Sequence, residues 1–138
     1  KQEAGQTMQI HQSAEDYLET ILMLSQRMGK VRSIDVVNEL GFTKASVSIA
    51  MKKLRENGYI AVDGEGNLTL LEPGLEIAQR IYSRHQLLTH FFVQLGVDEQ
   101  TAAEDACKAE HILSEQTLEK IREYALRHDA ESTLKNED

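Results

Sequence analysis

The chain has 138 residues, 41% hydrophobic and 28% charged, which is enough apolar surface for one domain or two small ones. Its single cysteine, Cys107, excludes an internal disulfide. No apolar run approaches the ~20 residues of a membrane span, and the N-terminus lacks the apolar core of a secretory signal. We therefore expect a cytoplasmic protein with no membrane partner.

The formal net charge of -8 is unevenly distributed along the chain. Between Arg27 and Arg55 there are seven basic and two acidic residues, a local excess of five positive charges, so the remainder stands at -13. Such asymmetry is typical of a nucleic-acid-binding surface on an acidic protein. Ordinary surface variation produces the same pattern, so charge alone leaves both interpretations open.

A first helix is predicted over residues 14–28. Ser13, followed three residues later by Asp16, resembles a capping box, and Gly29 ends the pattern. Apolar residues recur at helical spacing on one face, namely Tyr17, Ile21, Leu24 and Met28.

The next two predicted helices have the spacing of a helix-turn-helix. Ser33 can cap a short helix over residues 34–40, which Gly41 ends. After a tight turn, Thr43 can cap a third helix over residues 44–58. Two helices joined by about three residues that include glycine are characteristic of this DNA-binding motif.

Two β-rich runs follow, residues 59–62 and 68–71, on either side of the turn sequence DGEGN. A hairpin after a helix-turn-helix predicts a wing. Pro73 and Gly74 then begin a long helix that Gly96 ends, and two shorter helices are expected over residues 99–113 and 116–127.

The predicted fold is mainly α with a small β-hairpin wing. It comprises an N-terminal winged helix-turn-helix and a C-terminal helical dimerisation domain. We place the DNA-binding domain at residues 8–74, the helical dimerisation and metal-binding domain at residues 75–128, and a flexible polar tail at residues 129–138.

The third predicted helix is the candidate DNA reader, because short side chains at its start allow close approach to bases and phosphates. Serines near a helix start are also ordinary capping residues, but the wing and the local basic charge favour DNA binding. No arginine stands at the start of this helix, so base preference stays open. The candidate DNA-binding residues are Arg32, Ser33, Thr43, Lys44, Ala45, Ser46, Ser48, Lys52 and Lys53.

The stretch DACKAEHIL holds candidate metal ligands. At about 100° per residue, Cys107, Glu110 and His111 share a helix sector about 100° wide. Their thiol, carboxylate and imidazole are the mixed donors that first-row transition metals use. Further candidates stand on other predicted helices, namely Asp16, Glu19 and His85. Taken alone, each has a simpler interpretation: a core cysteine, a solvated helix start or a surface histidine.

In the motifs EDYLETI, RHQLL and DACKAEHILS, together with the helix-turn-helix and wing, the chain resembles the diphtheria toxin repressor family of iron- and manganese-dependent repressors. It is most similar to the two-domain, manganese transport regulator branch. The resemblance implies a metal-dependent repressor that acts as a homodimer on double-stranded operator DNA of metal-uptake and homeostasis genes. The implied metal ligands are Asp16, Glu19, His85, Cys107, Glu110 and His111.

The implied ligand set combines features of two branches. The manganese branch usually has glutamate where Cys107 stands, and the iron branch has methionine where Asp16 stands. A thiolate favours Fe(II), Co(II) or Zn(II), whereas carboxylates suit Mn(II) and Fe(II). We therefore expect Fe(II) as the effector and Mn(II) next, with Zn(II) or Co(II) also binding in vitro. We assign the dimer contacts to apolar residues of the last helices, with Ile112, Leu113, Leu118 and Ile121 as candidates.

Two alternatives remain at this level. The first is a winged-helix regulator with a non-metal or redox effector, in which Cys107 is a packed or oxidisable thiol. The second is a dimetal enzyme, but that chemistry typically needs paired Glu-x-x-His motifs, and the chain has none. We therefore predict that the protein is not an enzyme.

Overall fold

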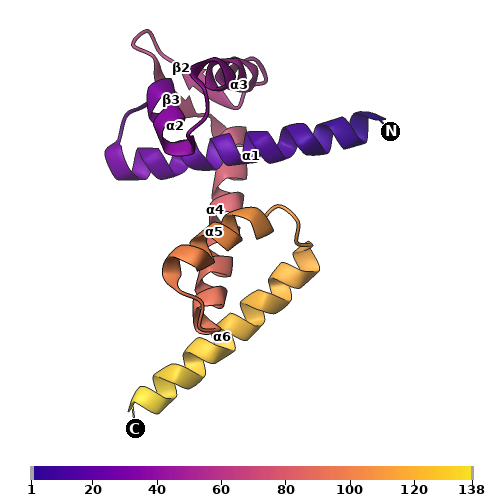
Figure 1. Cartoon of the computed structure of the whole chain (residues 1–138), viewed down its shortest axis with the longest axis vertical. Coiled ribbons are helices and arrows are strands. Elements are labelled where there is room, and N and C mark those ends of the chain that lie inside the picture. The colour runs from indigo at the N-terminus through magenta and orange to yellow at the C-terminus, as the bar shows by residue number, and fades with distance from the viewer. Residues whose placement is uncertain (1, 138) are drawn as a thin grey trace. The chain divides into compact units, whose positions relative to one another are not determined.

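The computed structural model describes the backbone of residues 2–137 and the side chains of residues 12–133. The fold divides into two compact units, Lys1–Ile81 and Tyr82–Asp138. The division lies inside one helix, a few residues after the predicted domain boundary at 74/75. Figure 1 shows helices and a small sheet in the first unit and helices in the second.

The first unit begins with helix α1 (Gln2–Met28), followed by α2 (Ser33–Leu40) and α3 (Lys44–Glu56). Because α1 already includes Ser13, the predicted capping box at that residue is wrong. Helix α1 ends where expected, at Gly29, whose φ of 84° suits glycine and not a residue with a side chain.

The helix-turn-helix forms where the sequence predicts it. Helix α2 ends at Gly41, which adopts a left-handed φ of 71°, and the Gly41 N–H donates to the carbonyl of Val37 at 2.8 Å. Helix α3 begins after Thr43, whose hydroxyl oxygen accepts a hydrogen bond from the Ser46 N–H at 3.1 Å. Both predicted helix boundaries in the turn are therefore confirmed.

The wing belongs to a three-stranded antiparallel sheet of order β1-β3-β2, formed by β1 (Val31–Arg32), β2 (Ile60–Val62) and β3 (Asn67–Leu70). Ile60 pairs with Leu70 in the hairpin, and Val31 pairs with Leu68 on the other edge of β3. The hairpin confirms the predicted wing. Strand β1 was not predicted, and it places β3 at the centre of the sheet.

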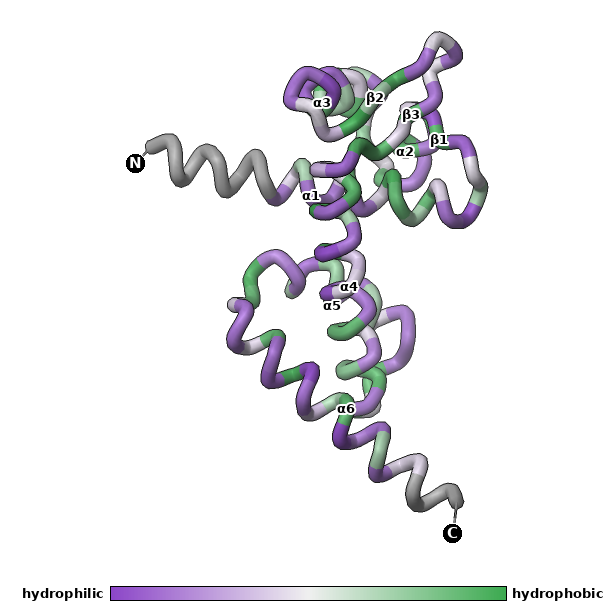
Figure 2. The backbone as a smooth tube through the Cα atoms, turned by 180° about the vertical axis from the view of Figure 1, so that it is seen from behind, coloured by the Kyte–Doolittle hydropathy of each residue, from purple (hydrophilic) through white to green (hydrophobic). Residues whose placement is uncertain are grey.

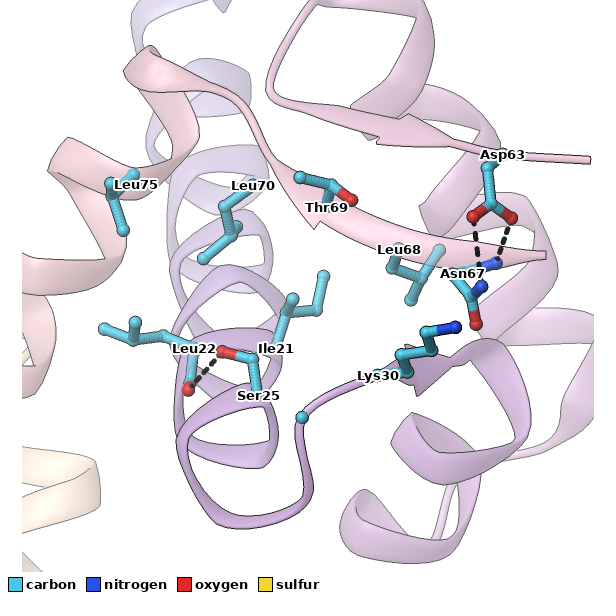
Figure 3. A pocket seen from close by; sticks show the side chains of 11 residues that line it. Ile21, Leu22, Ser25, Lys30, Asp63, Asn67, Leu68, Thr69, Leu70 and Leu75 are labelled. Carbon is cyan, nitrogen blue, oxygen red and sulfur yellow. Dashed lines mark hydrogen bonds between the residues drawn. The ribbon is translucent and has the colours of Figure 1, made fainter. Parts of the chain in front are cut away.

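The wing turn is closed by Asp63. One carboxylate oxygen accepts hydrogen bonds from the N–H groups of Glu65 and Asn67 at 2.9 Å, and the other accepts from the Asn67 side chain at 3.0 Å. These bonds, the Asn67 N–H first, lower the pKa of Asp63. Beside this turn, an open pocket of about 370 Å³ has an apolar floor that includes Leu22 and Leu75 (Figure 3).

The core of the first unit is formed by apolar faces of its helices and strands. Its members include Leu18, Ile21, Val31, Val36, Val47, Met51, Leu54, Ile60 and Leu68. Helix α4 (Glu72–Gln94) joins this unit through its first turns. There a Cβ on Gly74 would lie 2.2 Å from the Tyr59 carbonyl oxygen, so only glycine allows this approach.

The second unit contains the remainder of α4 with α5 (Glu99–Ala109) and α6 (Glu115–Glu137). Its core is formed by Leu88, Ala106 and Leu118. Leu118, a candidate dimer contact, is only 2% exposed, so that assignment is wrong for the folded chain. Ile112 is 78% exposed, and Leu113 and Ile121 pack partly against the core.

Two predicted helix ends in this unit need correction. Helix α5 ends at Ala109 and not at Leu113, because the Ile112 N–H bonds back to the Ala109 carbonyl in a tighter turn. Helix α6 continues past Arg127 to Glu137, and the coloured part of this extension is mainly hydrophilic (Figure 2). Its later turns are tied to α4, because Asp129 lies 2.9 Å from His90 Nε2 and accepts from Gln94 Nε2 at 2.8 Å. Among the described residues, no helix is both long and apolar enough to span a membrane.

Candidate metal centre and DNA-reading face

Helix α3 separates a buried face from an exposed one. Val47, Met51 and Leu54 are at most 6% exposed and face the core. The predicted DNA-binding residues on this helix and at its N-cap are all exposed, namely Thr43, Lys44, Ala45, Ser46, Ser48, Lys52 and Lys53. The short and basic side chains of this helix are therefore accessible from solvent, and their contact with DNA stays a prediction.

The other two predicted DNA-binding residues lie at the start of α2. Arg32 is exposed in β1, and its guanidinium is the group that a Cβ on Gly66 would meet, at 3.3 Å from Nη2. Ser33 is the first residue of α2 and is half-buried. Arg32 thus lies beside the wing turn, where the sequence alone gives no reason to place it.

Ile49, which the sequence does not single out, is 59% exposed on α3. A helical-wheel count would have revealed it, because Ile49 lies about 170° from the mean direction of the three buried residues at about 100° per residue. It therefore marks the middle of the exposed face.

The predicted metal ligands of the first unit lie one turn apart on α1. Asp16 is half-buried, and Glu19 is 5% exposed. The Thr20 hydroxyl donates to the Asp16 carbonyl oxygen at 2.7 Å, so the backbone here keeps its helical course. Burial, followed by the charge of Asp16, raises the pKa of Tyr17. Carboxylates buried in this way are paired or bind metals in folded proteins.

In the second unit, the structure brings together three predicted ligands, with His85 and His111 on either side of Glu110. This residue is 0% exposed, His85 Nδ1 lies 3.3 Å from its Oε2, and His111 Nε2 lies 3.5 Å from its Oε1. Among the described residues, neither carboxylate oxygen of Glu110 accepts a hydrogen bond. Two imidazoles and a buried carboxylate are thus gathered within a few ångströms.

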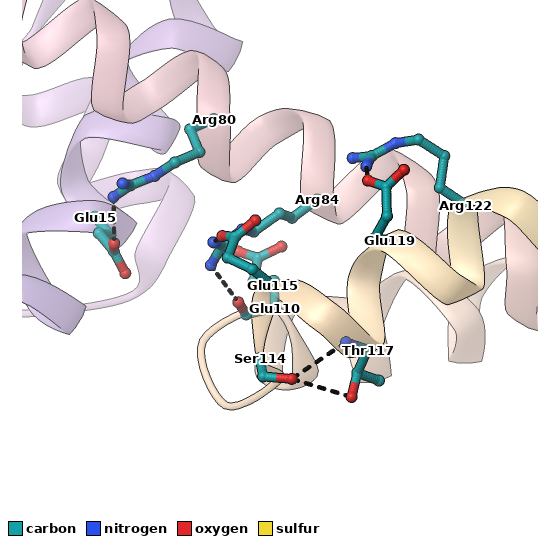
Figure 4. Close-up of polar contacts among 9 residues, drawn as sticks. All are labelled: Glu15, Arg80, Arg84, Glu110, Ser114, Glu115, Thr117, Glu119 and Arg122. Atoms are coloured by element: carbon teal, nitrogen blue, oxygen red, sulfur yellow. Dashed lines mark hydrogen bonds and ion pairs between the residues drawn. The ribbon is translucent and has the colours of Figure 1, made fainter.

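Arg84 supports the backbone of this cluster. Its guanidinium donates to the Glu110 carbonyl oxygen at 3.3 Å and forms an ion pair with Glu115 at the start of α6 (Figure 4). The arginine therefore holds the connection between α5 and α6 without occupying the carboxylate of Glu110. Ser114 begins α6 by accepting a hydrogen bond from the Thr117 N–H at 3.2 Å.

Cys107 lies on the last turn of α5 and is exposed. Glu110 is the C-cap of that helix, and His111 lies beyond it. The prediction that one continuous helix presents all three side chains is therefore wrong. The structure gathers Glu110 and His111 with His85 in a buried cluster, whereas Cys107 faces solvent.

Two family models match the chain. Residues 9–68 match the N-terminal DNA-binding domain of iron-dependent repressors, and residues 71–129 match their metal-binding and dimerisation domain. The chain is 37% identical over 113 residues to an uncharacterised HTH-type transcriptional regulator of Methanocaldococcus jannaschii, covering 80% of this chain and 90% of the relative. It is 34% identical over 109 residues to the regulator MntR of Bacillus subtilis, covering 79% and 77%.

Solved structures give the same picture. A manganese-dependent transcriptional repressor in complex with manganese superimposes with a TM-score of 0.73 at 28% identity, and the manganese regulator SloR with 0.70 at 26%. These matches cover 81% and 80% of this chain. The chain spans about half of each solved chain, 52% in both cases.

Proposed function

We propose that this chain, which belongs to the iron-dependent repressor family of metal-dependent DNA-binding transcriptional repressors, uses Fe(II) or Mn(II) as a corepressor for metal-uptake and homeostasis genes. Membership confirms the predicted resemblance, the winged helix-turn-helix fold and the absence of an enzymatic role, since family members are repressors. The family binds operator DNA and dimerises through its C-terminal domain.

The observation that carries the metal assignment is the buried carboxylate of Glu110 between His85 and His111. A buried carboxylate without hydrogen bonds is costly, and a divalent cation compensates its charge while accepting the neighbouring imidazoles as ligands. Nitrogen and oxygen donors of this kind fit Mn(II) and Fe(II). The residues present therefore suit such an ion, which would supply positive charge at the Glu110 carboxylate.

We propose six ligands from the two units. His85, Glu110 and His111 form the set in the second unit, and Asp16 and Glu19 contribute from α1. Cys107, exposed on the last turn of α5, is the sixth candidate. If metal raises the affinity for operator DNA, then by reciprocity operator DNA would raise the affinity for metal by the same factor.

The choice between iron and manganese depends on Cys107. A thiolate donor favours Fe(II), whereas the nitrogen and oxygen donors around Glu110 serve Mn(II) equally well. The manganese of the regulators cited above is a property of those proteins. We propose that Fe(II) is preferred when Cys107 coordinates and that Mn(II) serves equally when it does not.

Binding to the chain's own upstream DNA tests this function. Affinity should be low after chelation and rise after anaerobic addition of Fe(II) or Mn(II), with Zn(II) as a comparison. Glu110→Gln should lose the response, whereas Glu104→Gln, an exposed carboxylate on α5, should keep it. Equal binding with and without chelator would overturn the metal assignment and favour a non-metal or redox effector. Unchanged metal selectivity in Cys107→Ala would remove Cys107 from the ligand set.

A further inference from the structure

The outward face of α3 is apolar along its middle, and this feature has no part in holding the fold together. Ile49 is 59% exposed and lies opposite the buried face formed by Val47, Met51 and Leu54. Ala45, one turn earlier on the same side, is also exposed. These two residues therefore form a small apolar strip where the helix meets its partner.

The polar side chains next to this strip either cap helix α3 or lie on its next turn. The Thr43 hydroxyl donates to Ser46 Oγ at 2.9 Å while accepting from the Ser46 N–H, so both hydroxyls take part in capping α3. Lys52 and Lys53 follow on the next turn, where long cationic side chains suit phosphates. The centre of the exposed face of α3 thus offers methyl and methylene groups and no pair of polar atoms for a bidentate hydrogen bond to a base.

A lone exposed isoleucine needs no explanation on an ordinary surface. Ile49, however, lies in the segment that matches a DNA-binding domain and within the basic stretch 27–55. A recognition helix places such a residue against base edges in the major groove. The apolar group that DNA presents there is the 5-methyl group of thymine.

We propose that Ile49 is a specificity-determining residue that recognises a thymine in each operator half-site by contact with its 5-methyl group. This rests on the proposed function, because it concerns DNA bound by the metal-loaded repressor. Ala45 is small enough to let the Ile49 side chain reach the base edge. The preference for thymine at this position of the operator therefore comes from apolar contact and not from a bidentate hydrogen bond.

Uracil substitution isolates the methyl group. The probe is a duplex enriched from a random-sequence pool by the metal-loaded protein, with each thymine replaced in turn by deoxyuridine. One position per half-site should weaken parent binding about threefold to fivefold, the effect of one buried methyl group. Replacing both copies in the site of a two-fold dimer should multiply the losses.

The matched variants are Ile49→Ala and Ile34→Ala. Ile34 is another exposed isoleucine of the first unit, on α2, at 43% exposure. Ile49→Ala should bind the thymine and uracil duplexes equally at the sensitive position, whereas Ile34→Ala should discriminate as the parent does. Both variants should have the same unfolding temperature as the parent, which would show that neither substitution disturbs the fold.

The outcomes separate this inference from the function beneath it. If no thymine in the enriched duplex is sensitive to uracil, or if Ile49→Ala keeps the full sensitivity, Ile49 does not read thymine, and the repressor function stands. If the metal-loaded parent enriches no duplex, the proposed function fails and the inference fails with it.

Discussion

Glu110 is the residue on which the metal assignment depends, and its neutral analogue tests the role directly. Glu110→Gln keeps the shape of the side chain but replaces a buried carboxyl group whose oxygens accept no hydrogen bond among the described residues. Without metal, we expect the free energy of unfolding to be unchanged or higher by about 1 kcal/mol. With Mn(II) or Fe(II), the parent should gain thermal stability and the variant should not.

Thermal unfolding with chelator and with added metal gives both measurements. Glu104→Gln, on the exposed side of α5, is the control that should gain stability from metal like the parent. A metal-dependent rise in unfolding temperature that survives in Glu110→Gln would mean that the ion binds elsewhere.

At the scale of single residues, the sequence predicted a set of candidate donors but not how the structure arranges them. His85 and Glu110 are 25 positions apart in the chain, so their approach depends on how α4 packs beside the end of α5. The early end of α5 at Ala109 depends on a backbone turn that has no sequence signature at Glu110. The exposure of Cys107 follows from that same packing.

At the start of helix α4, Gly74 allows a close approach to the backbone of Tyr59. The Tyr59 carbonyl that a Cβ would meet at 2.2 Å is held by a hydrogen bond from the Leu71 N–H at 3.0 Å, so it has little freedom to move. Gly74→Ala should therefore lower the free energy of unfolding by about 1–3 kcal/mol. Urea unfolding measures the change.

Gly64→Ala is the matched control, because a Cβ there meets nothing within 4 Å. It should change stability by no more than about 0.5 kcal/mol. If Gly74→Ala is as well tolerated as Gly64→Ala, the start of α4 adjusts more readily than this contact implies.

Among the elements, those with local signals were predicted and those with only tertiary support were not. Thr43, Gly41 and the wing turn carry their own capping and turn chemistry, so α3 and the hairpin were found. Strand β1 has only two residues and no periodicity, and it exists because β3 offers an edge. The end of α6 lacks an apolar stripe, and contacts such as Asp129 with His90 come from 39 positions away.

For the whole molecule, stability should fall in acid. The Asn67 N–H lowers the pKa of Asp63, and the Thr101 N–H lowers that of Asp98, the N-cap of α5. A lowered folded pKa favours the ionised form, so this contribution is present above the unfolded value of about 3.9 and is lost as pH falls through the folded values.

The double variant Asp63→Asn, Asp98→Asn should unfold with a shallower dependence on pH below about pH 4, because asparagine caps without titrating. Thermal unfolding at a series of acidic pH values measures this slope. A double variant whose acid sensitivity equals that of the parent would place the titrating groups elsewhere.

The charge distribution also sets the salt dependence of DNA binding. The net charge of -8 opposes a polyanion, so binding depends on the local basic excess between residues 27 and 55. Lys52→Ala and Lys53→Ala should each weaken binding across sequences and reduce the slope of log affinity against log salt by about 1. Lys120→Ala, an exposed lysine of α6, should leave the slope unchanged, and a matching loss there would make the effect one of net charge alone.

Arg32 ends β1 and is also the N-cap of α2, where its N–H donates to Asp35 Oδ2 at 2.8 Å. The wing hairpin therefore pairs, through β3, with the strand whose last residue is the N-cap of the first helix of the helix-turn-helix. Amide hydrogens of β3 should exchange with solvent as slowly as those of α2, in one cooperative opening, and not at the rate of a surface loop. Native-state hydrogen exchange would then report the wing and the DNA reader as one unit of local unfolding.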